Sequence, residues 1–155
     1  KLKGIAMMGG DFPDPKREYN MACDPDASKI VLATGAPKFM GTYAVTRQVV
    51  MGQAEVEALR QSPDPACAAL AEQVDLWRPH SGNKPGPVVY DVCPIMWCFR
   101  PDLFTTRRYA IDVVTDGPER GRNVEREGAT LIDVSMSVDA AAALALLMGT
   151  LLGGA

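Results

Sequence analysis

The sequence lacks an excess of positive charge and any hydrophobic run long enough to span a membrane. Its 155 residues carry 16 Lys and Arg against 19 Asp and Glu, a formal net charge of −3 at pH 7. The longest uncharged stretch, residues 140–155, falls short of the roughly 20 apolar residues that cross a bilayer, so we expect a buried helix there. We therefore expect neither nucleic acid nor a membrane to be a partner.

Cysteine and histidine are also scarce. Four cysteines without CxxC spacing are too few for a disulfide scaffold and wrongly spaced for a zinc site, so we expect buried, reduced thiols. The single histidine, His80, begins a stretch rich in Gly, Pro, Ser and Asn that predicts a loop. A Ser-His-Asp triad would have to use it, and the neighbouring sequence carries none of the other expected signals. The cysteines are Cys23, Cys67, Cys93 and Cys98.

Several common catalytic motifs are absent. The sequence contains no GxGxxG, no GxxxxGK(S/T), no GxSxG and no HExxH, so it gives no support to a dinucleotide-binding protein, a P-loop enzyme, an esterase-type hydrolase or a zinc protease. What is present, 47% hydrophobic and 23% charged residues, is the composition of one ordinary folded domain.

The first apolar run predicts a strand that needs neighbours. Leu2 to Met8 is mostly apolar and is stopped by Gly9 and Gly10, which suits a buried strand followed by a sharp turn. A buried parallel strand has partners on both sides, and the chain begins at Lys1 rather than at a Met. We therefore expect the sequence to belong to a longer protein or a processed one.

Capping residues, prolines and apolar spacing predict that helices and strands alternate. Helices are predicted at Pro25 to Ala33 behind the N-cap Asp24, Gln53 to Gln61, Pro65 to Trp77, Pro94 to Phe99, and after Asp139. Strands are predicted at Phe39 to Thr46, Arg108 to Val114 and Ala129 to Met136, with a further short run at Val88 and Val89. We expect one α/β domain, a layered open sheet with helices on both faces.

Polar side chains follow two of the predicted strands. Glu18 and Asn20 come after the Gly9-Gly10 turn, and Asp91 follows Val88 and Val89. Ligands of open α/β sheets bind outside the carboxyl ends of strands, so these side chains could face one crevice. Their oxygens suit calcium, magnesium or sugar hydroxyls. A helix cap or an exposed charge is the alternative for each carboxylate.

The same residues carry a family resemblance. In order and spacing, Met8-Gly9-Gly10, Glu18-Tyr19-Asn20 and Asp24-Pro25-Asp26-Ala27 resemble the central signature of the inosine-uridine preferring nucleoside hydrolases. The likeness runs along almost the whole chain. Its other segments are Gly35-Ala36-Pro37, Tyr43-Ala44-Val45-Thr46, Gly86-Pro87-Val88-Val89-Tyr90-Asp91, Arg100-Pro101-Asp102-Leu103-Phe104 and Gly121-Arg122-Asn123-Val124.

The resemblance implies a Rossmann-like nucleoside hydrolase fold and a calcium-dependent enzyme that splits the N-glycosidic bond of ribonucleosides into ribose and a free base. Carried over by position, Asp91 would bind calcium, Glu18 and Asn20 would hold ribose hydroxyls, and Met8 would line the sugar pocket. The resemblance also implies a homo-oligomer that acts in purine or pyrimidine salvage in the cytoplasm.

Two departures from the family pattern change these expectations. The family's early Asp-x-Asp-x-x-x-Asp-Asp motif, which supplies most calcium ligands and the water-activating base, is missing. We therefore expect residues 1–155 to be the C-terminal portion of one hydrolase domain whose N-terminal half is missing, and this chain alone to be inactive. Tyr90 stands where many relatives have the histidine proposed to protonate the departing base, and a phenol, with a reference pKa of about 10, is a poorer proton donor. His80 is the other candidate donor.

An alternative function stays open. A truncated relative could keep a sugar-binding remnant or a subunit interface without turnover. Ribose binding without hydrolysis, even beside the upstream half, would favour such a non-catalytic module.

Overall fold

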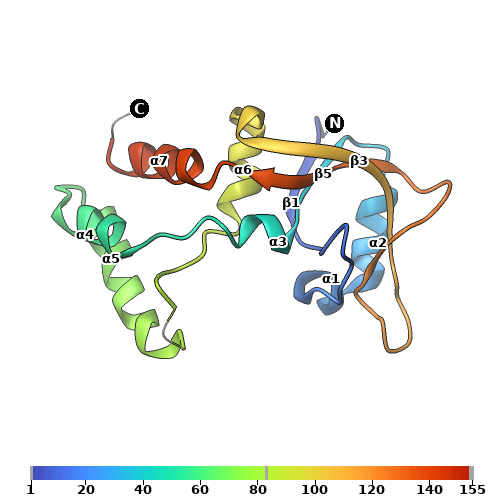
Figure 1. The fold of residues 1–155 in the computed structure, drawn as a ribbon, viewed down its shortest axis with the longest axis horizontal. Coiled ribbons are helices and arrows are strands. Elements are labelled where there is room, and N and C mark those ends of the chain that lie inside the picture. The colour runs from blue at the N-terminus through green and yellow to red at the C-terminus, as the bar shows by residue number, and fades with distance from the viewer. Residues whose placement is uncertain (1, 83, 154–155) are drawn as a thin grey trace.

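A mixed sheet with helices on both faces organises the molecule (Figure 1). The computed structural model describes residues 2–82 and 84–153, and within these the sheet has five strands in the order β1-β2-β5-β3-β4. The strands are β1 Ile5–Met8, β2 Lys38–Gly41, β3 Phe104–Val113, β4 Asn123–Glu125 and β5 Leu131–Val138. The α-helices are α1 Tyr19–Cys23, α2 Pro25–Ala33, α3 Tyr43–Thr46, α4 Gln53–Gln61, α5 Pro65–Trp77, α6 Val92–Phe99 and α7 Ala140–Leu151. Two short 3-10 helices are η1 Arg78–His80 and η2 Pro101–Leu103.

The strand directions bring two chain segments to one edge of the sheet. β1 and β2 run parallel with Met8 opposite Gly41, and β5 runs parallel to β2. β3 is antiparallel to both β5 and β4. The carboxyl ends of β1 and β2 therefore lie side by side, so the chain segments that follow them leave the sheet at the same place.

Alternate side chains of the strands pack on opposite faces, as a pleated strand requires. Met40 of β2 packs with Met21 of α1 and Leu32 of α2 on one face. Its neighbour Phe39 is fully buried on the other face, where its ring stacks on Trp97 of α6 at 4.5 Å between centroids. The predicted α/β sheet with helices on both faces is confirmed.

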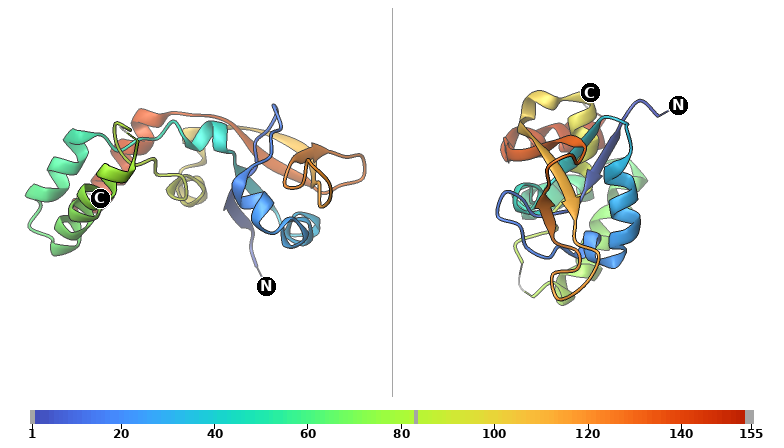
Figure 2. Two further views of the ribbon diagram at one scale, coloured as in Figure 1. Left: turned by 90° about the horizontal axis from the view of Figure 1, so that it is seen from below. Right: turned by 90° about the vertical axis from the view of Figure 1, so that its right-hand side faces the viewer.

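The helices α4 and α5 form a hairpin that stands apart from the sheet (Figures 1 and 2). Both begin and end at the predicted residues, because Ser62-Pro63-Asp64 interrupts the helical pattern and Asp64 caps α5 by accepting from the Ala66 N–H at 2.8 Å. Val56 and Leu59 of α4 are fully buried against Ala71 of α5. These side chains form an apolar cluster separate from those on the two faces of the sheet. Residues of α7 belong to this cluster, so α7 packs against the hairpin.

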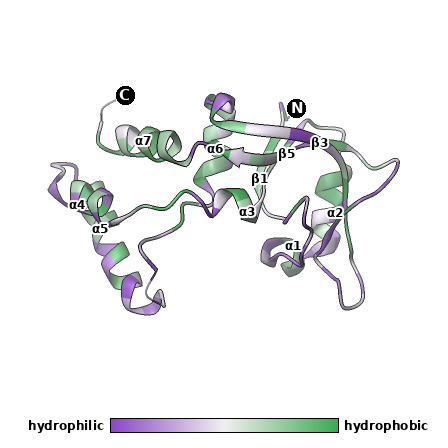
Figure 3. Ribbon diagram, viewed as in Figure 1, coloured by the Kyte–Doolittle hydropathy of each residue, from purple (hydrophilic) through white to green (hydrophobic). Residues whose placement is uncertain are grey.

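Helix α7 is less buried than predicted. Asp139 caps it as expected, accepting from the Ala142 N–H at 3.0 Å. Ala143 is its buried residue, while most of the helix is half-buried. The sequence of α7 is mostly alanine and leucine, so its exposed side is apolar as well (Figure 3). None of the described helices has the length and apolarity to cross a membrane.

Four predicted strands have different bounds, and the first of them, Leu2 to Met8, is shortened to Ile5–Met8 in β1. Phe39 to Thr46 was expected as one strand, but β2 ends at Gly41 and α3 begins at Tyr43. Two contacts account for this difference. One contact is distant: the Thr42 N–H donates to the Ser135 hydroxyl of β5 at 2.9 Å. The other is local, because the Thr46 hydroxyl donates to the Thr42 carbonyl one helical turn earlier. β3 starts earlier than predicted, at Phe104, and β5 spans Leu131–Val138 rather than Ala129 to Met136.

Elsewhere, Val88 forms only a single bridge with Val50, so the run before Asp91 is not a regular strand. Helix α1 was not predicted. The predicted helix Pro94 to Phe99 begins two residues earlier, at Val92.

Candidate functional site

The turn after β1 admits only glycine at one position. Gly10 has φ +72°, a backbone conformation that other residues rarely adopt. A Cβ at this residue would collide with the side-chain oxygen of Asn123 and lie 2.9 Å from the sulfur of Met40. The backbone of the turn therefore lies directly against β2 and β4, which fixes where its amide and carbonyl point.

Glu18 is held by this turn and caps the helix that follows. The residue is 7% exposed, and its Oε2 accepts from the N–H of Gly10 at 3.0 Å and of Met21 at 3.1 Å. The alternative interpretation of Glu18 as a helix cap is thus confirmed for Oε2, which caps α1. Because both bonds run to Oε2, Oε1 is the oxygen that could meet a ligand.

The side chains of Asn20 and Met8, which the family resemblance assigns to the sugar pocket, lie in contact. The Asn20 side-chain N–H lies 3.1 Å from the Met8 sulfur and 3.4 Å from its carbonyl oxygen. Both residues line a pocket of about 280 Å³ beside α1 and α2, together with Met7, Asp24 and Val31. The pocket has a mostly apolar wall that carries the Asn20 amide and the Asp24 carboxylate. Glu18 lies outside it and lines a separate hollow with Arg17 and Tyr19.

Asp91 occupies the N-cap position of α6 without acting as a cap. Its side chain accepts no capping hydrogen bond, and the residue is exposed. Helix capping therefore does not explain the carboxylate at this position. Burial, with a smaller contribution from Asp91, raises the pKa of the neighbouring Cys93 thiol to about 11. Cys67 and Cys93 are buried as predicted, whereas Cys23 and Cys98 are exposed, which corrects that expectation for two of the four thiols.

Tyr90 meets a residue that sequence reasoning did not place in the site. Its ring stacks on Tyr43 of α3, with centroids 5.8 Å apart and planes 16° from parallel. Burial, and then the neighbouring Tyr43, raise the pKa of Tyr90. The Tyr43 N–H donates to the Gly10 carbonyl at 2.9 Å. A chain of direct contacts therefore links Glu18, through Gly10 and Tyr43, to Tyr90.

Asp11 is a second residue beside this turn that the sequence analysis did not single out. It follows the Gly9-Gly10 turn, and burial raises the pKa of its carboxyl, opposed mainly by Lys16 and by a hydrogen bond from the Ala44 backbone. In the sequence, the position of Asp11 directly after Gly9 and Gly10 was the feature that could have singled it out. For Tyr43, the feature was the motif Tyr43-Ala44-Val45-Thr46.

His80 lies in a different part of the fold. It is exposed in η1, the short 3-10 helix that continues α5 at the end of the hairpin. The contacts that join Glu18, Gly10, Tyr43 and Tyr90 do not include it. A larger hollow of about 380 Å³, between α2 and β3, contains none of the predicted residues.

The described residues do not by themselves form a calcium site. No three His, Cys, Asp or Glu side chains among them are grouped so that they could hold a metal ion. Calcium takes about 6–8 oxygen ligands, and Asp91 offers a single exposed carboxylate. The chemistry of this donor fits calcium, but the number of donors does not.

The comparisons with known proteins agree with the motifs and the fold. The sequence profile described as "Inosine-uridine preferring nucleoside hydrolase" matches residues 1–148. The pyrimidine-specific ribonucleoside hydrolase RihA of Enterobacter sp. (strain 638) is 31% identical over 141 residues, which cover 86% of this chain and 43% of that protein. RihA of Salmonella typhi is 30% identical with the same coverage.

Solved structures give the same result. The purine-preferring ribonucleoside hydrolase from Gardnerella vaginalis superposes with a TM-score of 0.87 at 25% identity, over 97% of this chain and 52% of that one. The inosine-uridine preferring nucleoside hydrolase from Bacillus anthracis shares the fold, with a TM-score of 0.78 at 20% identity over 100% of this chain and 53% of that one. This chain spans about half the length of the relatives it matches. It belongs to the inosine-uridine preferring nucleoside hydrolase family.

Proposed function

We propose that this chain supplies the later part of the active site of an enzyme that hydrolyses the N-glycosidic bond of ribonucleosides, releasing ribose and a free base. The observation that carries the proposal is the link from Glu18 through Gly10 and Tyr43 to Tyr90, directly before Asp91. This link joins two of the residues that the family resemblance implicates, Glu18 and Tyr90, beside the carboxyl ends of β1 and β2, and α/β sheets bind ligands at such ends.

Glu18 and Asn20 would hold the ribose. Oε1 of Glu18 can accept a hydrogen bond from a ribose hydroxyl while Oε2 stays bonded to Gly10 and Met21. The Asn20 amide can bind a second hydroxyl, and Met8 can cover an apolar side of the sugar. A fixed sugar places its anomeric carbon for attack, and a nearby carboxylate stabilises the positive charge that develops on the ring.

Asp91 would contribute one ligand to a calcium ion. Its carboxylate is exposed, makes no capping bond and belongs to the hard oxygen donors that calcium prefers. A bound calcium ion supplies Lewis acidity and a water of lowered pKa. Asp91 would hold one side of such a site, and because the described residues offer no group of three such side chains, we propose that the other ligands come from further sequence.

We propose that those ligands lie in an N-terminal half that is missing here, so that this chain alone is inactive. The relatives' length supports this, since 141 aligned residues cover 43% of the Enterobacter protein. We expect the intact polypeptide to have a mass of about twice 16.6 kDa. A mass of 16.6 kDa for the protein as it exists in its source would contradict this part of the proposal.

Tyr90 would face the leaving base. Because burial raises the pKa of its phenol, Tyr90 stays protonated at neutral pH and donates a hydrogen bond rather than a proton. His80 remains the other candidate donor, and it would have to approach from η1. We also propose a homo-oligomeric enzyme of nucleoside salvage in the cytoplasm, as the family resemblance implies.

A non-catalytic module is the second candidate. The absence of a three-ligand metal group among the described residues favours it, because a relative that has lost its metal could still bind ribose. The two candidates differ in turnover: the module binds ribose and releases no base.

The test measures ribose release from purine and pyrimidine nucleosides by the intact protein that carries residues 1–155, with calcium and after chelation. We expect hydrolysis that chelation abolishes and calcium restores. Asp91→Asn should lower the rate at saturating calcium by about 100-fold or more, since charge stabilisation of the transition state is lost. Ribose binding without turnover would support the module instead. Full activity of Asp91→Asn would remove Asp91 from the metal site.

A further inference from the structure

Tyr43 has a fixed backbone and a partly free side chain. Its N–H is bonded to Gly10, and the preceding residue, Thr42, is fully buried with its N–H bonded to Ser135. Tyr43 nevertheless stays 38% exposed at the start of α3. An aromatic ring anchored this firmly to the turn that binds Glu18, yet open to solvent, is available to a ligand of the same site.

The surroundings of the ring define the ligand chemistry. Tyr43 lies nearly parallel to Tyr90, and the two phenols are close enough for the Tyr43 hydroxyl to raise the pKa of Tyr90. Two neutral phenols provide aromatic surface and hydrogen-bond donors together. The Arg47 guanidinium lies 5.6 Å from the Tyr43 ring centroid, so positive charge is already present beside the pair. The pair therefore suits a planar, uncharged heteroaromatic group with acceptor atoms on its edge.

We propose that Tyr43 is a specificity-determining residue which, with Tyr90, forms the wall of the site that contacts the nucleobase. This inference rests on the proposed function, in which Tyr90 faces the departing base. It adds a residue from α3 to the base side of the site, opposite in role to Glu18 and Asn20, which hold the sugar. The wall discriminates between nucleosides and free ribose, because only the nucleoside presents an aromatic group.

The test compares binding of uridine, inosine and ribose to the intact protein by calorimetry. Tyr43→Ala should weaken nucleoside binding by roughly 3- to 10-fold, the usual worth of one aromatic contact, and leave ribose binding unchanged. Tyr43→Phe keeps the ring and should retain most of the nucleoside affinity. Phe99→Ala is the matched control, since Phe99 is a 76% exposed aromatic residue at the end of α6, and it should change neither affinity.

A spectroscopic readout tests the contact between the two phenols independently of ligand binding. Tyr43→Phe removes the hydroxyl that raises the pKa of Tyr90, so the phenolate absorbance of Tyr90, identified by its loss in Tyr90→Phe, should develop at lower pH than in the wild type. Equal losses of ribose and nucleoside binding in Tyr43→Ala would overturn the inference, as would unchanged nucleoside binding. A wild type that binds ribose and no nucleoside contradicts the proposed function as well as this inference.

Discussion

Glu18 serves the fold and, by our proposal, the substrate with one carboxylate. The two N–H groups bonded to Oε2 come from Gly10 and Met21, so the glutamate joins the turn after β1 to the start of α1. A buried carboxylate held in this way cannot change rotamer without leaving two donors unsatisfied. Its second oxygen is therefore fixed in position before any ligand arrives, which favours binding by lowering the ordering cost.

The turn beside Glu18 offers a sharp test at Gly10. Gly10→Ala should destabilise the protein more than Gly128→Ala, although both glycines have positive φ, +72° and +80°. Alanine in this conformation costs about 1–2 kcal/mol at either position. Only at Gly10 must Asn123 and Met40 move as well, because nothing lies within 4 Å of a Cβ at Gly128. Urea unfolding measures both variants, and equal losses would contradict the packing described for the turn.

Tyr90 predicts a dependence of stability on high pH. Folding raises the pKa of this phenol through burial, so the folded state holds the proton more tightly than the unfolded chain does. The contribution is fully present below the unfolded pKa of about 10 and is lost as the pH rises through the folded value. Above pH 10, the unfolding free energy of the wild type should therefore fall relative to that of Tyr90→Phe. A difference that stays constant from pH 8 to 11 would contradict the burial of this hydroxyl.

At the scale of elements, local signals determined what could be predicted from the sequence. Asp24 with Pro25 and Asp64 with Pro65 mark helix starts within a few residues, and α2, α4 and α5 agree with their predicted ranges. The end of β2 depends on a partner far along the chain, Ser135 for Thr42, and helix α1 depends on how the turn at Gly10 folds back onto Glu18. No local pattern contains those contacts.

The candidate site divides in the same way. Glu18, Asn20 and Met8 are close in sequence to one turn, so their grouping could be predicted. The pairing of Tyr43 with Tyr90 joins α3 to the segment before α6, and it depends on how the whole α4–α5 hairpin returns the chain to the sheet. The position of His80 likewise follows from the hairpin and not from its own loop.

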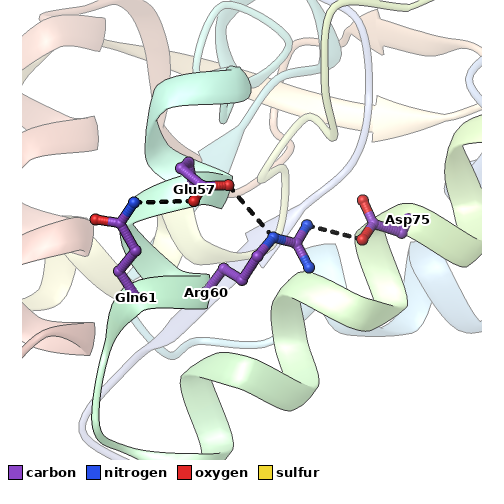
Figure 4. A network of polar contacts seen from close by, with 4 residues as sticks. All are labelled: Glu57, Arg60, Gln61 and Asp75. Carbon is purple, nitrogen blue, oxygen red and sulfur yellow. Dashed lines mark hydrogen bonds and ion pairs between the residues drawn. The ribbon is translucent and has the colours of Figure 1, made fainter.

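The hairpin should depend on its apolar contacts far more than on its ion pairs. Leu59→Ala should cost about 2–5 kcal/mol, because Leu59 is fully buried between α4 and α5. Asp75→Ala removes the 2.7 Å pair with Arg60 in the exposed network of Figure 4 and should change stability very little, since solvent screens such charges. Thermal unfolding of the two variants distinguishes these effects, and a larger loss in Asp75→Ala would refute this account of the hairpin.

At the scale of the whole molecule, the fold supports our proposal of a ligand site at the carboxyl ends of β1 and β2. β1 pairs with β2 alone within the described residues, and the relatives extend over about twice this length. In our proposal, the residues that contact the sugar and base lie on this chain, whereas most of the calcium ligands lie in sequence outside it. The account therefore predicts an active site that is completed by further sequence.

The most direct test of that account is the rate of ribose release from nucleosides by the intact protein carrying Glu18→Gln. The glutamine keeps an oxygen for the turn but loses the negative charge, so we expect the rate to fall by about 100-fold or more with the fold retained. Glu72→Gln, on the exposed side of α5, should act as the wild type does. A Glu18→Gln protein that releases ribose at the wild-type rate, or a wild type that releases none, would contradict the central claim.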